Sequence, residues 1–207
     1  MARPTNLKLH KFSKESFING CYIPENICDD LITYFDNNPE RQTSGQMFNE
    51  TDGNYVDTNR KDSLDISFWI YQNQKDAQIL SRYFFYLDLC RKEYEYKYDR
   101  VKYLAKYNID SYVNIQKYEP SGGYKKWHCE RAGFRDANRC LAFMTYLNNV
   151  SDGGTDFKYQ KTTAPAKKGL TLIWPSDWTH THKGQVSHTQ QKYIITGWTV
   201  YEDPIFN

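Results

Sequence analysis

The hydrophobic pattern changes near residue 111, and this change restricts the fold more than any other feature of the chain. From there on, apolar and polar side chains alternate in segments separated by clusters of Gly, Pro, Asn, Asp and Ser. A period of two with turn residues between the segments is typical of antiparallel β-strands. We expect strands in YVNIQKY, RCLAFMTYLNNV, TDFKY, LTLIW and KYIITGWTVY. The pattern therefore predicts two packed sheets, a double-stranded β-helix or jelly roll.

The first half of the chain indicates helices that support these sheets. A helix is expected from Pro24 to about Phe35, because proline favours the first helical turn and apolar residues recur along one face. A longer helical pattern, rich in aromatic residues, covers 75–106. FINGCYI and LDISFWI alternate and predict two further strands. The fold class is therefore α+β.

A polar, turn-rich segment lies between the predicted helices. DNNPERQTSGQMFNETDGNYVDTNRKDS has no apolar period, so we expect a long loop, with residues 38–62 as a candidate lid over a site. A chain of 207 residues can bury one substantial core. We therefore predict a single domain over 1–207, in which 1–110 supply helical support and the lid, and 111–207 form the jelly roll that carries the chemistry.

Composition limits the expected partners. The 27 basic and 25 acidic residues nearly balance, which gives no reason to expect binding to nucleic acid or to an acidic membrane. The segment MARPTNLKLHKFSKESF lacks the apolar core of a signal peptide, and no apolar run approaches a membrane span. The five cysteines have no regular spacing, which argues against a disulfide framework. We expect a soluble, cytoplasmic protein, and its oligomeric state remains open.

The motif WHCER provides the first chemical signal. Residues i and i+2 of a strand point to the same face, so His128 and Glu130 can aim at one point. One imidazole and one carboxylate are two of the three ligands of a non-haem iron site. The alternative is an ordinary histidine–glutamate pair at a strand end. An iron site requires a second histidine from elsewhere in the chain.

The remaining histidines supply candidates for that second ligand. Three of them, His180, His182 and His188, cluster in WPSDWTHTHKGQVSH, directly after the apolar strand GLTLIWP. His180 and His182 would share a face in an extended segment, so either can complete the site. For His188 an exposed loop position is favoured. Two histidines and one carboxylate would leave three positions of an iron ion open.

Lys192 begins the last predicted strand, ten residues after His182. An inward-facing lysine in a β core is costly unless an anion accompanies it. That anion could be Glu130 or a small dicarboxylate bound near the metal. The alternative is a structural lysine at a strand edge.

Taken in order, these segments resemble the iron(II)/2-oxoglutarate oxygenases, and among them the prolyl 4-hydroxylase-like group. YEPSGGYKKWHCE is similar to the Tyr, glycine-turn, Tyr-x-x-His-x-Asp segment of that group. RCLAFMTYLNNVSDGGTDF is similar to its Arg, strand, Tyr-Leu-Asn and Gly-Gly segment. KKGLTLIWPSDWTHTHKGQVSHTQQKYIITGW resembles its Lys-Gly strand, His-x-Gly-x-x-Val, Lys and Trp. The resemblance covers roughly residues 112–200, and compact members of this kind occur in bacteria and phages.

The resemblance implies roles for individual residues. It makes His128 and His182 the iron-binding histidines, and places Glu130 where the group usually has an aspartate. Glutamate is one methylene longer, so its carboxylate must sit differently to reach the metal. Lys192 would bind the distal carboxylate of 2-oxoglutarate. The remaining assignments are hydroxyl groups that assist the co-substrate and one residue on the substrate side: Tyr118, Thr155 and Trp198.

The function implied is a dioxygenase that uses Fe(II), 2-oxoglutarate and O2, with ascorbate as a further candidate cofactor. It would hydroxylate an unactivated C–H bond, with a peptidyl proline or similar peptide side chain favoured over a free amino acid or small metabolite. Succinate and CO2 would be released. The alternative is a jelly-roll or cupin-type metal-binding protein that does not use 2-oxoglutarate. Such a protein would not need His128, Glu130, His182 and Lys192 together.

Overall fold

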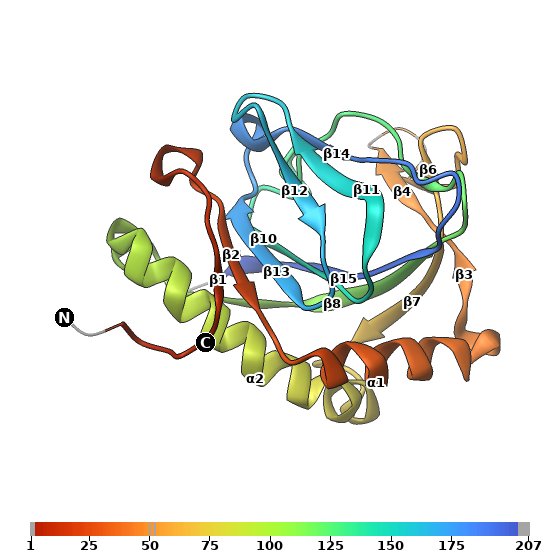
Figure 1. Ribbon diagram of the computed structural model, residues 1–207, viewed down its shortest axis with the longest axis horizontal. Helices are drawn as coiled ribbons and strands as arrows, with labels where there is room; N and C mark the ends of the chain where they lie inside the picture. Colours follow the sequence, from red (N-terminus) through yellow and green to blue (C-terminus); the bar gives the residue numbers. More distant parts are fainter. Residues whose placement is uncertain (1–2, 50, 52, 203–207) are drawn as a thin grey trace.

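An antiparallel sheet of eight strands forms the centre of the molecule (Figure 1). The computed structural model describes residues 3–49, 51 and 53–202. In spatial order the strands are β1 (Leu9–His10), β2 (Asn19–Tyr22), β13 (Leu170–Pro175), β10 (Arg139–Tyr146), β15 (Lys192–Tyr201), β8 (Tyr107–Tyr118), β7 (Leu64–Trp69) and β3 (Thr43–Ser44). All neighbouring pairs run antiparallel.

A smaller sheet of three strands packs against one face of the large sheet. Its strands, in spatial order, are β12 (Thr162–Ala166), β11 (Val150–Phe157) and β14 (His182–Gly184). The core between the sheets includes Tyr146, Phe157 and Trp174, each at most 2% exposed. The antiparallel double-stranded β-helix predicted from the alternation is therefore confirmed.

The alternation within β10 shows why both faces of the large sheet are buried. Leu141 and Phe143 point into the core beneath the helices, whereas Ala142, Met144 and Tyr146 point into the core between the sheets. Successive side chains of a strand face opposite sides, so one central strand serves both cores. A strand of this kind carries few polar residues, as β10 does.

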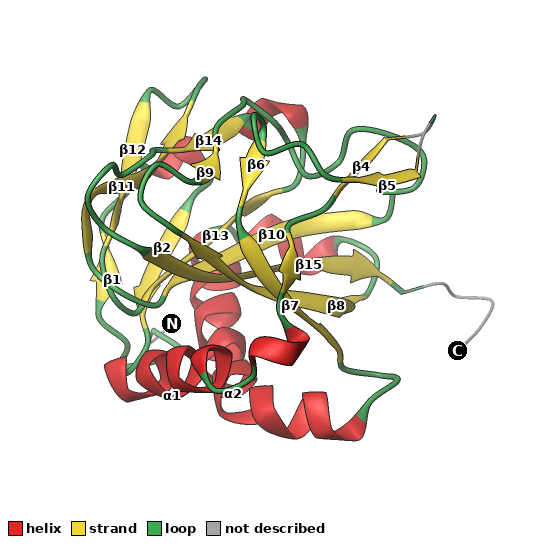
Figure 2. Cartoon of the chain, turned by 90° about the vertical axis from the view of Figure 1, so that its right-hand side faces the viewer, coloured by secondary structure: helices red, strands yellow, loops and turns green. Residues whose placement is uncertain are grey.

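Two helices cover the outer face of the large sheet (Figure 2). They are α1 (Glu25–Asp36) and α2 (Gln74–Lys97). Helix α1 begins after Pro24, as predicted. Helix α2 ends earlier than the predicted residue 106, because Tyr98 leaves the helical conformation, buries its ring and donates its hydroxyl to the Ile18 carbonyl. Within the described residues, no helix combines the length and apolarity needed to cross a membrane.

The segment expected to be a long loop contains short strands. Besides β3, they are β4 (Met47–Asn49) and β5 (Gly53–Tyr55), which form a hairpin, and β6 (Lys61–Asp62), which pairs with β9 (Gly123–Tyr124). Among the residues that the structure describes, four short 3₁₀ helices complete the fold: η1 (Lys14–Ser16), η2 (Pro39–Arg41), η3 (Asp99–Tyr103) and η4 (Trp178–His180). Strands β1, β2, β3 and β7 come from residues 1–110 but belong to the large sheet. The organisation as one domain stays a prediction.

Candidate active site

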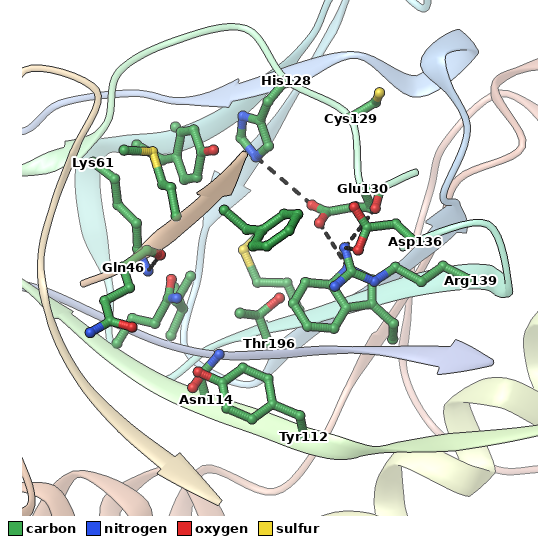
Figure 3. Close-up of a pocket in the computed structure, with 18 of the residues that line it drawn as sticks. Gln46, Lys61, Tyr112, Asn114, His128, Cys129, Glu130, Asp136, Arg139 and Thr196 are labelled. Carbon is green, nitrogen blue, oxygen red and sulfur yellow. Dashed lines mark hydrogen bonds and ion pairs between the residues drawn. The ribbon is translucent and has the colours of Figure 1, made fainter. Parts of the chain in front are cut away.

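His128 and His182 are held side by side by their own backbones. Each donates its amide N–H to the carbonyl of the other, with N···O distances of 2.9 and 2.8 Å. This is an isolated antiparallel bridge between the segment after β9 and the start of β14. Two residues later, the Glu130 amide donates to the Ser176 carbonyl at 3.1 Å, which fixes the carboxylate beside the histidines. Figure 3 shows His128 and Glu130 facing each other.

The three side chains converge on one point. Glu130 Oε1 lies 3.8 Å from His128 Nε2 and 3.2 Å from His182 Nε2. The three candidate ligand atoms all lie within 4.8 Å of one another. The structure therefore brings together the histidine–carboxylate pair of WHCER and the second histidine.

The hydrogen bonds at the far side of each imidazole set its tautomer. His128 Nδ1 lies 3.0 Å from the Lys126 carbonyl, and His182 Nδ1 lies 2.8 Å from the His180 carbonyl. A carbonyl only accepts, so in each ring Nδ1 carries the hydrogen. In the neutral rings Nε2 then presents a lone pair towards Glu130. A proton or a metal cation can lie between these three donor atoms, and two imidazoles with one carboxylate suit Fe(II).

The protonation states of His128 and Glu130 near pH 7 favour metal binding. Burial lowers the pKa of His128 to about 4, so its imidazole is neutral near pH 7. Burial alone would raise the pKa of Glu130, but His182, in the protonated form in which its Nε2 can donate to this carboxylate, and the positive charge of Arg139 contribute to lowering it to about 2. The carboxylate is therefore ionised. Neutral imidazoles and an ionised carboxylate are the forms that bind metal ions.

The other candidate histidines lie outside this cluster. His180 is buried, and its Nε2 forms a 2.9 Å hydrogen bond with the Ser16 carbonyl. Burial lowers its pKa. His188 hydrogen-bonds to Ser121 at the surface. Of the two candidates left open by the sequence, His182 is the one that faces Glu130.

Lys192 is buried without an anionic partner among the described residues. Its ammonium donates to the Gly153 carbonyl at 3.0 Å and to the Gln185 carbonyl at 2.8 Å. An ammonium has three N–H groups, so one remains for a ligand. Burial lowers the Lys192 pKa to about 8. A side chain added at Gly153 would collide with Val150 and crowd the Lys192 chain, so glycine at this place leaves the lysine room.

The two predicted hydroxyl residues lie near Lys192. Tyr118 is directly opposite it in the β8–β15 pair, with its ring centroid 5.3 Å from Nζ. The Thr155 hydroxyl forms a 2.6 Å hydrogen bond with the hydroxyl of Tyr146. We did not predict a role for Tyr146. Its place in the Tyr-Leu-Asn segment was visible in the sequence, but its direction is known only from the register of β10.

One cavity of about 850 Å³ is lined by the three candidate ligands, by Lys192 and by the hydroxyl residues Tyr118, Tyr146 and Thr155. The hairpin β4–β5 contributes Met47, Phe48 and Tyr55 to its wall, so part of the candidate lid borders the cavity. The Tyr124 ring stacks on His128 with a centroid distance of 3.6 Å and an interplanar angle of 18°. The sequence analysis assigned no role to Tyr124, although it is the second tyrosine of the matched segment; three residues, not two, separate it from His128.

Trp198 has a more specific contact than a general place on the substrate side. It lines the cavity, and its indole N–H donates to Glu130 Oε2 at 2.7 Å. Arg139 lies over the indole at 3.7 Å and donates to the Glu130 carbonyl at 2.7 Å. Arg139, labelled in Figure 3, also pairs with Asp136 at 3.1 Å.

Comparison with solved structures supports the assignment of the fold. A prolyl-4-hydroxylase of Pseudomonas putida is 14% identical with a TM-score of 0.65, and the match covers 91% of this chain and 94% of that one. A prolyl hydroxylase of Trichoplax adhaerens, in complex with a hypoxia inducible factor oxygen degradation domain peptide fragment, is 18% identical with a TM-score of 0.61, covering 87% and 83%. The viral collagen prolyl hydroxylase of Paramecium bursaria Chlorella virus-1, in its 2OG complex, is 16% identical with a TM-score of 0.58, covering 90% and 97%.

Comparison of sequences adds the family. No curated protein matches the chain. Residues 113–200 match the family model described as the 2OG-Fe(II) oxygenase superfamily, and this range contains the candidate ligands and Lys192. Residues 113–200 are therefore similar to the 2OG-Fe(II) oxygenase superfamily, and the chain has the fold of the prolyl 4-hydroxylases.

Proposed function

We propose that the protein is a 2-oxoglutarate-dependent dioxygenase that hydroxylates a peptide side chain, with peptidyl proline as the favoured target. One observation carries the proposal: a His–Glu–His cluster shares a cavity with a buried lysine that forms no ion pair with any described residue. The cluster suits Fe(II), and the lysine suits the far carboxylate of a dicarboxylate co-substrate.

In this proposal His128, Glu130 and His182 hold Fe(II). When bound, the iron and 2-oxoglutarate supply the oxidising chemistry, in which O2 is consumed, succinate and CO2 are released, and a C–H bond becomes C–OH. The chain supplies orientation. The third N–H of Lys192 would bind the far carboxylate of the co-substrate through a charge-assisted hydrogen bond and so orient the co-substrate in the cavity. The Tyr146–Thr155 hydroxyl pair and Tyr118 provide further polar contacts in that part of the cavity.

The aromatic residues that line the cavity support a peptide substrate. Along β7 and β8 its wall carries Trp69 and Tyr112, whose rings pack 4.7 Å apart. Phe48 and Tyr55 lie on the hairpin β4–β5. Aromatic rings next to exposed polar groups are typical of surfaces that bind peptides. The similar structures are prolyl hydroxylases, and one of them holds a peptide.

The test is substrate-dependent turnover. Purified protein with Fe(II), 2-oxoglutarate and ascorbate is offered proline-containing peptides, free proline, and peptides in which alanine replaces proline. We expect succinate formation to rise with the proline peptides, together with a gain of one oxygen in the peptide mass. Stimulation by free amino acids alone would contradict the peptide assignment. A lack of any 2-oxoglutarate consumption would favour a cupin-type metal protein.

A further inference from the structure

The two oxygens of Glu130 have different surroundings. Oε1 faces His128 and His182 at 3.8 and 3.2 Å. Oε2 accepts the 2.7 Å hydrogen bond from the Trp198 indole. An indole N–H can donate but not accept, so it can neither bind a metal nor exchange roles with the carboxylate. The contact therefore turns one oxygen towards the site and the other away from it.

Irregular strand pairing places the indole at this point. Trp198 pairs with Ala142 of β10, but the register between β15 and β8 shifts between Gly197 and Thr199. The pairing of β10 with β15 is likewise irregular just after Arg139. Such irregularities redirect side chains next to active sites.

Arg139 completes the support. Its guanidinium covers the indole at 3.7 Å, and it also binds the Glu130 carbonyl. Arg139 is itself held by Asp136, so the indole rests against a fixed group. Trp198, Arg139 and Glu130 therefore form one connected unit.

We propose that Trp198 is a positioning residue that keeps Glu130 a single-oxygen ligand of the metal. This inference rests on the proposed function. Two histidines and one carboxylate oxygen leave three metal positions, which suffice for two atoms of 2-oxoglutarate and one of O2. If both oxygens of Glu130 bound the metal, only two positions would remain. The longer glutamate side chain could place both of its oxygens on the metal. The hydrogen bond from the Trp198 indole holds Oε2 away from the metal.

The experiment measures 2-oxoglutarate binding to the Co(II)-loaded protein, without O2 or substrate. Trp198→Phe removes the donor and keeps an aromatic ring. We expect the Kd for 2-oxoglutarate to rise about tenfold or more. Loss of a hydrogen bond to a metal ligand typically costs about 10- to 100-fold in metal affinity or activity, and we expect the lower end of that range. We also expect Co(II) to remain bound, with a changed visible spectrum. Trp178→Phe is the matched control, since Trp178 is 65% exposed and lies outside the cavity lining.

Repeating the Trp198 substitution in a Glu130→Asp variant distinguishes the positioning of the carboxylate from other roles of Trp198. In Glu130→Asp the carboxylate is withdrawn by about 1.5 Å, one C–C bond, so the indole can no longer reach it. Trp198→Phe should then change the Kd less than twofold. An equal loss in both backgrounds, or no loss in the original chain, would overturn the proposal. If the unaltered protein binds Co(II) but not 2-oxoglutarate, the proposed function fails before any variant is compared.

Discussion

At the scale of single residues, two of the histidines should be essential for metal binding. We expect His128→Ala and His182→Ala to abolish Co(II) binding and 2-oxoglutarate turnover, because each removes one of three converging ligand atoms. His180→Ala should retain both activities and lose about 1 kcal/mol of stability, the usual net value of a hydrogen bond such as the one to Ser16. Metal titration and chemical denaturation measure the two effects. An active His182→Ala variant would contradict the assignment.

Lys192 gives a prediction for pH. Its pKa is lowered to about 8 by burial, and a dicarboxylate binds the protonated form. The Kd for 2-oxoglutarate should therefore be constant below pH 8 and rise as the ammonium loses its proton above it. Lys192→Ala should raise the Kd about 10- to 100-fold at pH 7, as expected for a lost hydrogen bond to a charged group. In Lys192→Arg the side chain stays charged above pH 8, so the Kd for 2-oxoglutarate should not rise with pH. A Kd that does not change with pH in the unaltered protein would exclude Lys192 from the site.

The sequence indicated the candidate ligands but not their supports. His128 and Glu130 were paired through their spacing of two, although the structure forms only an isolated bridge at His128 instead of a strand, and His182 was preferred to His180 only through the family resemblance. The contacts of Trp198, Tyr124 and Arg139 were not predictable. They depend on strand irregularities and ring packing, which leave no periodic pattern in the chain.

At the scale of elements, strand length decided what could be predicted. Each strand of six or more residues in the large sheet was recognised from its alternation, including β7, β8, β10, β13 and β15. Strands β9 and β14, with two and three residues, are too short to show a period. Strand β12, TTAPA, was missed because its small residues provide little hydrophobic contrast.

The hairpin β4–β5 should contribute to the binding of a peptide substrate. Arg135 lies over the Phe48 ring at 3.9 Å and links the hairpin to the loop after Glu130. Arg135→Ala should raise KM for a peptide substrate about 2- to 30-fold, the range expected for a cation–π contact, and leave 2-oxoglutarate binding unchanged. Arg131→Ala is the control, because Arg131 lies in the same loop but pairs with Asp177. Equal effects of the two variants would argue against closure by the hairpin.

At the scale of the whole molecule, the site joins distant parts of the chain. The bridge between His128 and His182 connects β14 of the small sheet to the segment after β9, while Trp198 connects Glu130 to the large sheet. A ligand bound only by the folded state stabilises it by about 2.7 kcal/mol at one hundred times its Kd. For a chain of this size, each kcal/mol raises Tm by roughly 2–4 °C, so Co(II) should raise Tm by roughly 5–10 °C. Glu130→Ala should remove the increase, and an increase retained in that variant would place the metal elsewhere.

Fe(II) and 2-oxoglutarate should bind together in this cavity. The most direct measurement is an anaerobic titration with both, following the weak visible charge-transfer band of the iron chelate. We predict a band that requires both additions and is absent in His128→Ala. A protein that binds Fe(II) but shows no band with 2-oxoglutarate would contradict the claim.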